Sequence, residues 1–210
     1  MPFGDAVSMD LGTGTTVGTT ASIGVEPYAN WVQTTGFPNF SRTNMADQTT
    51  TATTLDLTAA ALAGNVSSRA AGSGDLFNMY TRGVAGTGGA GSTFAFSDNP
   101  YAEYDVILYF GEQAANSAGN LQSFSDGTTT YYYDTQGADN FNSGTFTQVT
   151  STSSGSPDTA GNYVRFSGLT AAAVTVTVVS ILGGDIALVG MQVIEVTGGA
   201  STILPFRMRY

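Results

Sequence analysis

The segment from residue 183 to residue 196 constrains the fold of this chain more than any other. It opens with Gly183-Gly184-Asp185 and continues as an apolar run that is rich in β-branched side chains. Turn residues followed by such a run predict a strand that is buried on both faces. Gly190 interrupts the run, which predicts a β-bulge or the close approach of another backbone. A similar apolar run, residues 104–110, is the predicted partner strand.

The remainder of the chain consists of short alternating segments, and none has a sustained helical period. The segments with a period of two residues are 53–57, 93–96, 121–124, 128–134, 145–149, 163–166 and 174–178. Asp126-Gly127 lies between two of them and has the composition of a type I′ hairpin turn. Many short strands joined by glycine-rich turns predict an all-β protein, a β-sandwich or jelly roll.

We divide the chain into three parts on the basis of composition. Residues 1–20, rich in Gly and Thr, are predicted to be an extended N-terminal arm, and residues 21–198 to be the jelly-roll sandwich. Residues 199–210 are predicted to be a C-terminal tail strand. In this tail, apolar and other side chains alternate, as Leu204, Phe206, Met208 and Tyr210 against Ile203, Pro205, Arg207 and Arg209.

The tail carries two of the six arginines of a chain whose net charge is −10. An amphipathic strand of this kind is suited to pairing with a neighbouring subunit's sheet edge, where Arg207 and Arg209 would meet acidic groups. The N-terminal arm is suited to similar exchange. The alternative is that the tail closes an edge of its own sandwich, and the sequence leaves both open.

Composition excludes several classes of function. The chain has no lysine, and six scattered arginines cannot form the basic face that a nucleic-acid-binding protein needs. No apolar run approaches the roughly 20 residues that span a bilayer, so membrane insertion is not expected. Residues 1–10 lack the basic and apolar regions of a signal peptide. We therefore expect either a removed leader or another route out of the cell, for instance inside a virion.

The residue types also argue against catalysis. Without His, Cys or Lys there is no Ser-His-Asp triad, thiol nucleophile, Schiff base or usual zinc site. A glycosidase needs only two carboxylates, but no spacing marks the candidates, which are Glu26, Glu103, Asp105 and Glu112. Residues 86–91 match G-x-G-x-x-G, yet a strand-like segment follows instead of a helix, so we interpret them as a turn. We predict a protein that is not an enzyme.

Two groups of residues have the chemistry of a carbohydrate site. Tyr131 and Tyr133 share one face of a predicted strand, and Asp134 follows them. A predicted loop holds Tyr28, Asn30 and Trp31. Sugar sites combine aromatic rings with a few amide and carboxylate groups. The alternative at both places is that the rings pack inside the sandwich.

No cofactor is predicted, and Ca²⁺ is the ion that the loop oxygens would suit best as a structural ligand. The candidate ligands are Asp98, Asn99, Glu103, Asp126, Asp139 and Asp158. None has the spacing of an EF-hand loop, and solvated turn residues explain them equally well.

Four landmarks follow one another in a familiar order. They are Gly24-Val25-Glu26-Pro27-Tyr28-Ala29-Asn30-Trp31, residues 104–110, residues 162–169 and Gly190-Met191-Gln192-Val193-Ile194. The order resembles that of a family of secreted bacterial β-sandwich modules similar to galactose-binding-like jelly rolls. There an early Gly-Val-x-Pro…Asn-Trp stretch, a Tyr-Asp-Val-Tyr-Val-Tyr-Phe-like strand and a closing Gly-Ile-Gln-Ile-Val-like strand recur. The resemblance covers roughly residues 21–197, and it implies carbohydrate recognition or adhesion.

Two hypotheses about function follow. The first is a non-catalytic, surface-displayed module that binds a glycan or cell-surface polysaccharide. The alternative is a structural protein of a virion or extracellular filament, such as a head-decoration, spike or fibre protein, whose terminal arms bind copies of itself or other subunits. The expected location is extracellular, on a cell surface or on a virion surface. The two are compatible if an assembly displays the sandwich to host glycans.

Overall fold

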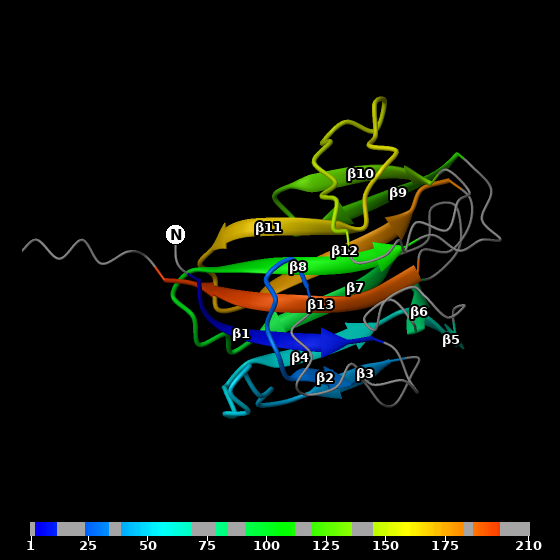
Figure 1. Cartoon of the computed structure of the whole chain (residues 1–210). Coiled ribbons are helices and arrows are strands. Elements are labelled where there is room, and N and C mark those ends of the chain that lie inside the picture. Colours follow the sequence, from blue (N-terminus) through cyan, green and yellow to red (C-terminus); the bar gives the residue numbers. More distant parts are fainter. Residues whose placement is uncertain are drawn as a thin grey trace, which may run out of the picture.

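The computed structural model describes residues 3–11, 24–33, 39–68, 79–83, 91–111, 119–135, 145–182 and 187–197. They form two β-sheets that pack face to face (Figure 1). This confirms the prediction of an all-β sandwich. The described ranges contain no helix with the length and apolar character needed to cross a lipid bilayer.

The first sheet has the two longest apolar runs at its centre. Its order is β11 (Tyr163–Leu169), β8 (Tyr104–Gly111), β13 (Ala187–Val196), β1 (Phe3–Asp10) and β2 (Trp31–Gln33), with β6 (Met79–Gly83) also paired to β13 and β5 (Leu62–Ser68) paired to β6. The β1–β2 pair is parallel, and the other described pairs of this sheet are antiparallel.

The second sheet is antiparallel throughout its described pairs. Its order is β10 (Thr130–Thr135), β9 (Asn120–Ser125), β12 (Val174–Ser180), β7 (Ser92–Ser97), β4 (Asp56–Ala60) and β3 (Phe40–Arg42). Four of these strands were predicted at nearly the same residues, and β4 lies three residues later than its predicted segment.

The predicted pairing of β13 with β8 is confirmed. Val193 lies opposite Val106 and Met191 opposite Leu108, and the register shifts between Leu188 and Gly190. The shift confirms the bulge predicted at Gly190. Every residue of β8 is buried, because both faces of the first sheet are covered.

The two faces of the first sheet contribute to separate apolar clusters. The inner face packs against the second sheet, and there the rings of Phe110 and Phe124 stack with centroids 4.5 Å apart. The outer face carries Ile107, Tyr109 and Ile194, against which half-buried side chains of residues 24–30 and 145–150 pack. Loops therefore cover the apolar side chains of the outer face, just as the second sheet covers those of the inner face.

The predicted N-terminal arm is wrong for residues 3–10. They form β1, which lies between β13 and β2 in the first sheet, and Val7, Met9 and Leu11 point into the interior. The alternation is obscured in the sequence by Gly4 and Asp5, where the register with β13 shifts. Residues 12–20 of the predicted arm and the whole predicted tail, residues 199–210, lie outside the described residues.

Two local predictions are also wrong. Residues 145–149 are not a strand, because only Gln148 forms a bridge, to Tyr163. The β9–β10 hairpin is confirmed, but Ser125 pairs with Thr130, so its loop has four residues instead of two. A type I′ turn needs two positive φ angles, and here only Gly127 has one. The carboxylate of Asp126 shapes the loop by accepting hydrogen bonds from the Thr128 and Thr129 amides, at 2.8 and 2.6 Å.

Residues 145–162 run along the edge strands of both sheets. The Val149 amide donates to the Tyr163 carbonyl of β11 at 2.9 Å, and the Tyr132 amide of β10 donates to the Ser151 carbonyl at 2.8 Å. Further along, the Asp134 amide donates to the Asp158 carbonyl at 2.8 Å. This loop, drawn above β10 in Figure 1, covers polar backbone groups that would otherwise be open to pairing with another chain.

Candidate functional site

The tyrosines of β10 pack inside the sandwich. Tyr133 is fully buried, and its ring centroid lies 5.2 Å from that of Phe110. Tyr131 is half-buried, with its ring centroid 5.4 Å from that of Phe166. Asp134 belongs to the opposite face of the strand because side chains alternate. The proposed Tyr131–Tyr133–Asp134 sugar platform is therefore not brought together, since the face that carries both rings is the one that the core requires.

The second predicted group is also largely internal. Trp31 is only 3% exposed, and its Nε1 donates to the Tyr28 carbonyl at 3.0 Å. Asn30 adopts a left-handed backbone conformation with φ of 59°, and its side-chain amide donates to the Asp47 carbonyl. Tyr28 is half-buried, and its hydroxyl donates to the Gly4 carbonyl at 3.1 Å. Within this group, Tyr28 alone keeps a partly exposed ring.

Residues 24–30, which we call the strap, lie across the outer face of the first sheet. The Val25 amide donates to the Tyr109 hydroxyl at 2.8 Å, and that hydroxyl donates to Gln192 Oε1. Gln192 Nε2 in turn lies 3.0 Å from the Glu26 carbonyl and 3.1 Å from Ser8 Oγ. Burial raises the pKa of Tyr109, so its hydroxyl keeps its proton for this network.

An ion-paired arginine holds the strap at a second point. Arg165 Nη2 lies 2.6 Å from Asp105 Oδ2, and Arg165 Nη1 lies 3.1 Å from Glu26 Oε1. Burial would lower the pKa of Arg165, but the hydrogen bonds and charges of Asp105 and Glu26 outweigh it and raise that pKa. Two of the four carboxylates that we considered for a glycosidase thus share one guanidinium and fix a loop to a sheet.

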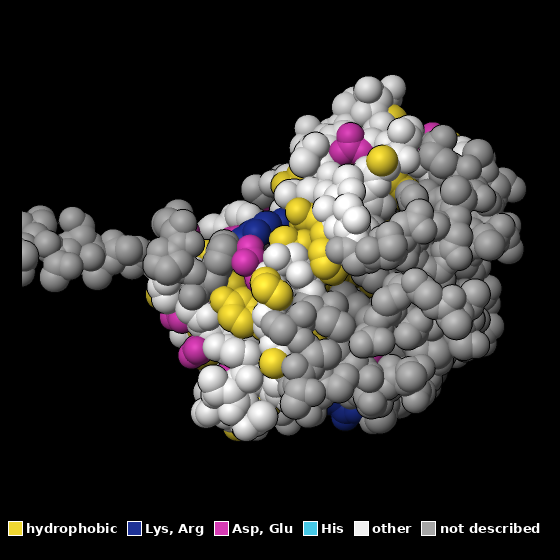
Figure 2. Space-filling view, in the orientation of Figure 1, with side chains coloured by type: hydrophobic (Ala, Val, Ile, Leu, Met, Phe, Trp, Pro, Cys, Tyr) yellow, Lys and Arg dark blue, Asp and Glu magenta, His cyan; other side chains and the backbone are white. Residues whose placement is uncertain are grey.

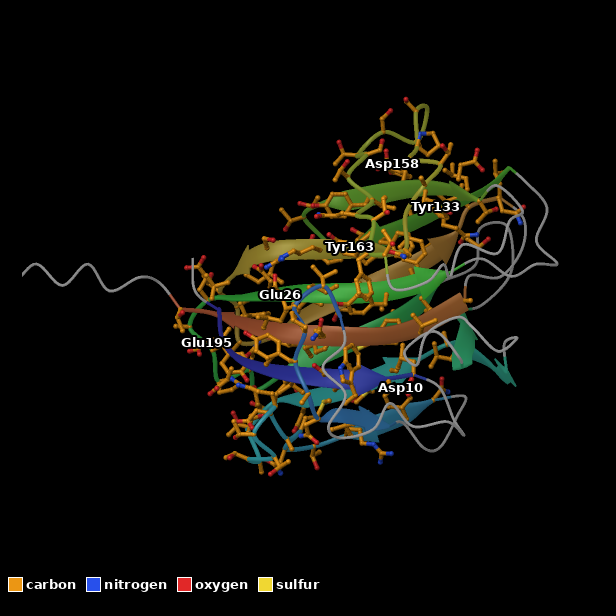
Figure 3. All side chains as sticks on the ribbon, in the orientation of Figure 1. Asp10, Glu26, Tyr133, Asp158, Tyr163 and Glu195 are labelled. Carbon is orange, nitrogen blue, oxygen red and sulfur yellow. The ribbon has the colours of Figure 1, made fainter. Side chains whose placement is uncertain are left out.

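The outer face also carries a partly apolar surface, the outer-face patch, formed by the side chains of Val25, Pro27, Tyr28 and Phe146 over the buried Tyr163. Figure 2 shows hydrophobic side chains next to basic and acidic ones on this face, and Figure 3 shows Glu26 and Tyr163 on the same side of the first sheet. The rings of Tyr163 and Phe146 meet edge to face, with centroids 6.5 Å apart. The Tyr163 hydroxyl donates to Gln148 Oε1 at 3.4 Å.

A second candidate site lies at the end of the sandwich where β13 finishes and β1 begins, near Glu195 in Figure 3. The charges of three carboxylates, those of Asp5, Asp47 and Glu195, act on the Tyr101 hydroxyl, and we call these three residues the acidic cluster. Their negative charges, together with the larger effect of burial, raise the pKa of Tyr101. The Asp5 amide donates to Glu195 Oε2 at 3.1 Å, and Gln48 Nε2 donates to Asp5 Oδ1 at 2.9 Å.

The acidic cluster is not balanced by positive charge. The structure gives none of the three carboxylates an ion pair with a described side chain. Tyr101 is 8% exposed, and its hydroxyl has no hydrogen-bond partner among the described residues. Sequence reasoning missed this site because its members come from four separate segments, and only the β1–β13 pairing brings Asp5 to Glu195.

The predicted calcium ligands are not brought together. Asp126 serves the β9–β10 loop, and Asp158 Oδ2 accepts from the Thr150 and Ser151 amides at 2.6 and 2.8 Å. Asp139 lies outside the described residues. In the part of the chain that the structure describes, no three His, Cys, Asp or Glu side chains are grouped in a way that could hold a metal ion.

Comparison of the chain with protein-family models, with curated proteins and with solved structures gives no match.

Proposed function

We propose that the protein is a structural subunit of a virion or extracellular filament, and that it acts by binding copies of itself or other subunits. The observation that carries this proposal is the acidic cluster, whose three carboxylates have no cationic partner among the described side chains. The tail of the same chain holds Arg207 and Arg209 but no acidic residue. The charges are therefore complementary between two parts of one chain.

Electrostatics explains why such a subunit would associate. The three carboxylates without a cationic partner leave this end of the sandwich negatively charged. A cationic segment from another subunit would be attracted to this charge, which would also set the orientation of the partner. Closure of the β11 and β10 edges by residues 145–162 supports the proposal as well, because it removes two strand edges through which subunits could otherwise pair.

The absolute mass in solution tests this proposal. We expect the full chain to form a defined oligomer at micromolar concentration and a chain that ends at Gly199 to be monomeric. The full-chain oligomer should dissociate as the salt concentration rises, because screening weakens exposed charge pairs. A full chain that stays monomeric at every concentration and salt concentration would contradict the proposal.

A second function, binding of a glycan or cell-surface polysaccharide, is supported by the outer-face patch. Partly exposed rings of Tyr28 and Phe146 pack against one cluster on the outer face, and Glu26 and Arg165 form an ion pair that holds the strap on that face. Aromatic rings combined with charged groups are used to bind sugars. The strap fixes these groups in place, which lowers the cost of ordering them on binding. A galactose-binding-like jelly-roll identity would fit this function and is part of the same proposal.

Glycan binding can be tested with one variant and a matched control. We expect Phe146→Ala to weaken binding on a glycan array about tenfold, because a stacking ring is lost. Leu182→Ala is the control, since Leu182 is 52% exposed and lies outside the patch. Equal binding by both variants, or no binding by the parent protein, would exclude this site. The two functions are compatible, and both place the protein outside the cell or on a virion surface.

A further inference from the structure

We infer that the outer face of the second sheet binds the same face of a second copy of the chain. We call this surface the neutral face. Its central row consists of Ala60, Thr93, Thr177, Ser125 and Thr130, which lie side by side on β4, β7, β12, β9 and β10. This inference rests on the proposed structural function, and it specifies a contact surface and the partner that fits it.

Alternation along the strands places the central row on the outside of the sandwich. Phe94, Val176 and Phe124 belong to the core, so the residues next to them on β7, β12 and β9 point away from it. Every side chain of the central row is partly exposed. The outer face of the first sheet differs, because the strap and Phe146 cover its apolar side chains. The second sheet therefore presents an open face to solvent.

Charge is excluded from the centre of the neutral face. The charged residues of the six strands are Arg42, Asp56 and Asp134, and each lies at or next to a strand end. The chain as a whole has 16 acidic residues and a net charge of −10. Two copies of so acidic a chain repel each other least when neutral surfaces meet. Depletion of charge is also typical of the core of a protein interface.

The hydroxyl groups make the neutral face complementary to itself. A Ser or Thr hydroxyl both donates and accepts a hydrogen bond, so the same face of a second copy offers a partner to each. Ser41 and Thr58 already pair in this way between β3 and β4, with their hydroxyl oxygens 3.2 Å apart. A two-fold contact brings identical patches together and requires such self-complementarity. A second copy of the chain is therefore the partner that this face fits.

Apolar side chains at one end of the neutral face add a hydrophobic contribution. Val179 and Tyr132 are partly exposed, and both lie opposite Ser123, on the two strands that flank β9. Leu182 follows β12 at the same end, where its amide donates to the Leu121 carbonyl at 3.2 Å. Leu182 is 52% exposed, more than any other large apolar side chain that the structure describes. Exposed apolar groups that gather in one place are typical of interaction surfaces.

The size of the neutral face is sufficient for a weak specific contact. Strands about 4.8 Å apart, with a rise of about 3.3 Å per residue, give the six-stranded sheet a face of about 500 Å². Two such faces bury about 1,000 Å² in total, which is near the smallest area of a specific interface. We therefore expect this contact to strengthen the proposed tail contact by holding each subunit at two points. A chain that ends at Gly199 should accordingly stay monomeric at micromolar concentration.

A charge placed at the centre of the neutral face tests the inference in the full chain. We expect Thr177→Arg to raise the dissociation constant of the oligomer about tenfold or more, because like charges would then face each other across the contact. Thr147→Arg is the matched control, since Thr147 is an exposed threonine of the loop that lies on the first sheet. Sedimentation velocity measures the dissociation constants, and circular dichroism checks that both variants have retained their β-sheet structure.

A labelling experiment locates the contact without disrupting it. The chain has no cysteine, so a single introduced thiol reports on one position. Thr175 is an exposed residue of β12 that points to the same side as Thr177. In Thr175→Cys, the rate of reaction with a maleimide should fall several-fold as the protein concentration rises and the oligomer forms. In Thr147→Cys, the rate should not depend on the protein concentration.

The results distinguish this inference from the proposed function. If the parent chain forms an oligomer but the variants at Thr177 and Thr175 behave like their controls, the structural function stands and the inference is wrong. If the Thr175→Cys thiol reacts slowly even in a monomer, the chain covers its own face, which also overturns the inference. If the oligomer depends on Thr177 but not on the tail, the inference stands and the tail is not the assembly segment. A parent chain that is monomeric at every concentration would overturn both.

Discussion

Arg165 of β11 and Asp105 of β8 form an ion pair in which two guanidinium nitrogens, Nη2 and Nε, lie 2.6 and 2.7 Å from the same oxygen, Asp105 Oδ2. The other oxygen, Oδ1, accepts the Gly168 amide at 2.8 Å. The side chains of Arg165 and Asp105 are only 16% and 6% exposed. The pair therefore joins the edge strand to its neighbour in a nearly dry environment, and Glu26 extends it to the strap.

Removal of Arg165 should be strongly destabilising. We expect Arg165→Met to lower the free energy of unfolding by about 3 kcal/mol, because Asp105 is left as a buried charge without a counter-ion. The double variant Arg165→Met/Asp105→Leu should lose less stability than Arg165→Met alone, since it also removes the unpaired charge of Asp105. Urea unfolding of both variants measures the difference. A double variant that is less stable than the single variant would contradict this account.

The strand content of the chain was largely predictable because a sandwich imposes simple patterns. Runs such as 104–110 and 186–196 are apolar at adjacent positions and lie next to turn residues, which is typical of a strand buried on both faces. β1 was missed because Gly4, Asp5, Ser8 and Asp10 dilute its apolar residues. Residues 145–149, where only Gln148 forms a bridge, were predicted as a strand because alternation alone does not show whether a neighbouring backbone is available for pairing.

The candidate sites were much less predictable than the fold. Tyr131 and Tyr133 were correctly placed on one face, but sequence alone does not show which face of β10 meets the core. Asp5, Tyr101 and Glu195 are far apart in the sequence, and each resembles an ordinary surface or turn residue there. The β1–β13 register, which long-range packing determines, brings Asp5 to Glu195.

The strap should loosen when the Tyr109 hydroxyl is removed. In Tyr109→Phe the Val25 amide loses its acceptor and Gln192 Oε1 loses a donor. We therefore expect the free energy of unfolding to fall by about 1–2 kcal/mol. Hydrogen exchange of the Val25 amide should accelerate, while amides at the centre of the β8–β13 pair stay protected. Tyr132→Phe is the control, because the Tyr132 hydroxyl has no hydrogen bond to the described residues. A similar loss of stability in both variants would contradict a specific role for Tyr109.

The stability contribution of Asp47 should depend on pH. Burial alone would raise its pKa, but hydrogen bonds from the Thr49 hydroxyl and the Thr51 and Thr49 amides outweigh burial and lower that pKa below 3.8. Because the folded protein favours the ionised form, this contribution is complete above the unfolded pKa and is lost as the pH falls through the folded pKa.

The test compares Asp47→Asn with the parent protein. At neutral pH the variant should be less stable by about 1–2 kcal/mol, since a charged acceptor has been replaced by a neutral one. The gap should close as the pH falls below 3.8, where the parent carboxylate also becomes neutral. Urea unfolding at several pH values measures this difference in the free energy of unfolding. A gap that widens in acid would show that the ionised form is not favoured by folding.

Two glycines with nearly the same backbone angle should respond differently to alanine. Gly91 and Gly168 have φ of 74° and 70°, so each substitution carries a similar backbone cost of about 1 kcal/mol. A Cβ at Gly91 would lie 2.6 Å from the Val178 carbonyl oxygen, whereas at Gly168 the nearest atom is 3.8 Å away. The backbone of β12 cannot move away easily because it is hydrogen-bonded in the sheet. The free energy of unfolding should therefore fall by about 1–3 kcal/mol more in Gly91→Ala than in Gly168→Ala. Thermal unfolding of the two variants gives the difference, and equal losses would mean that β7 and β12 separate at this end at little cost.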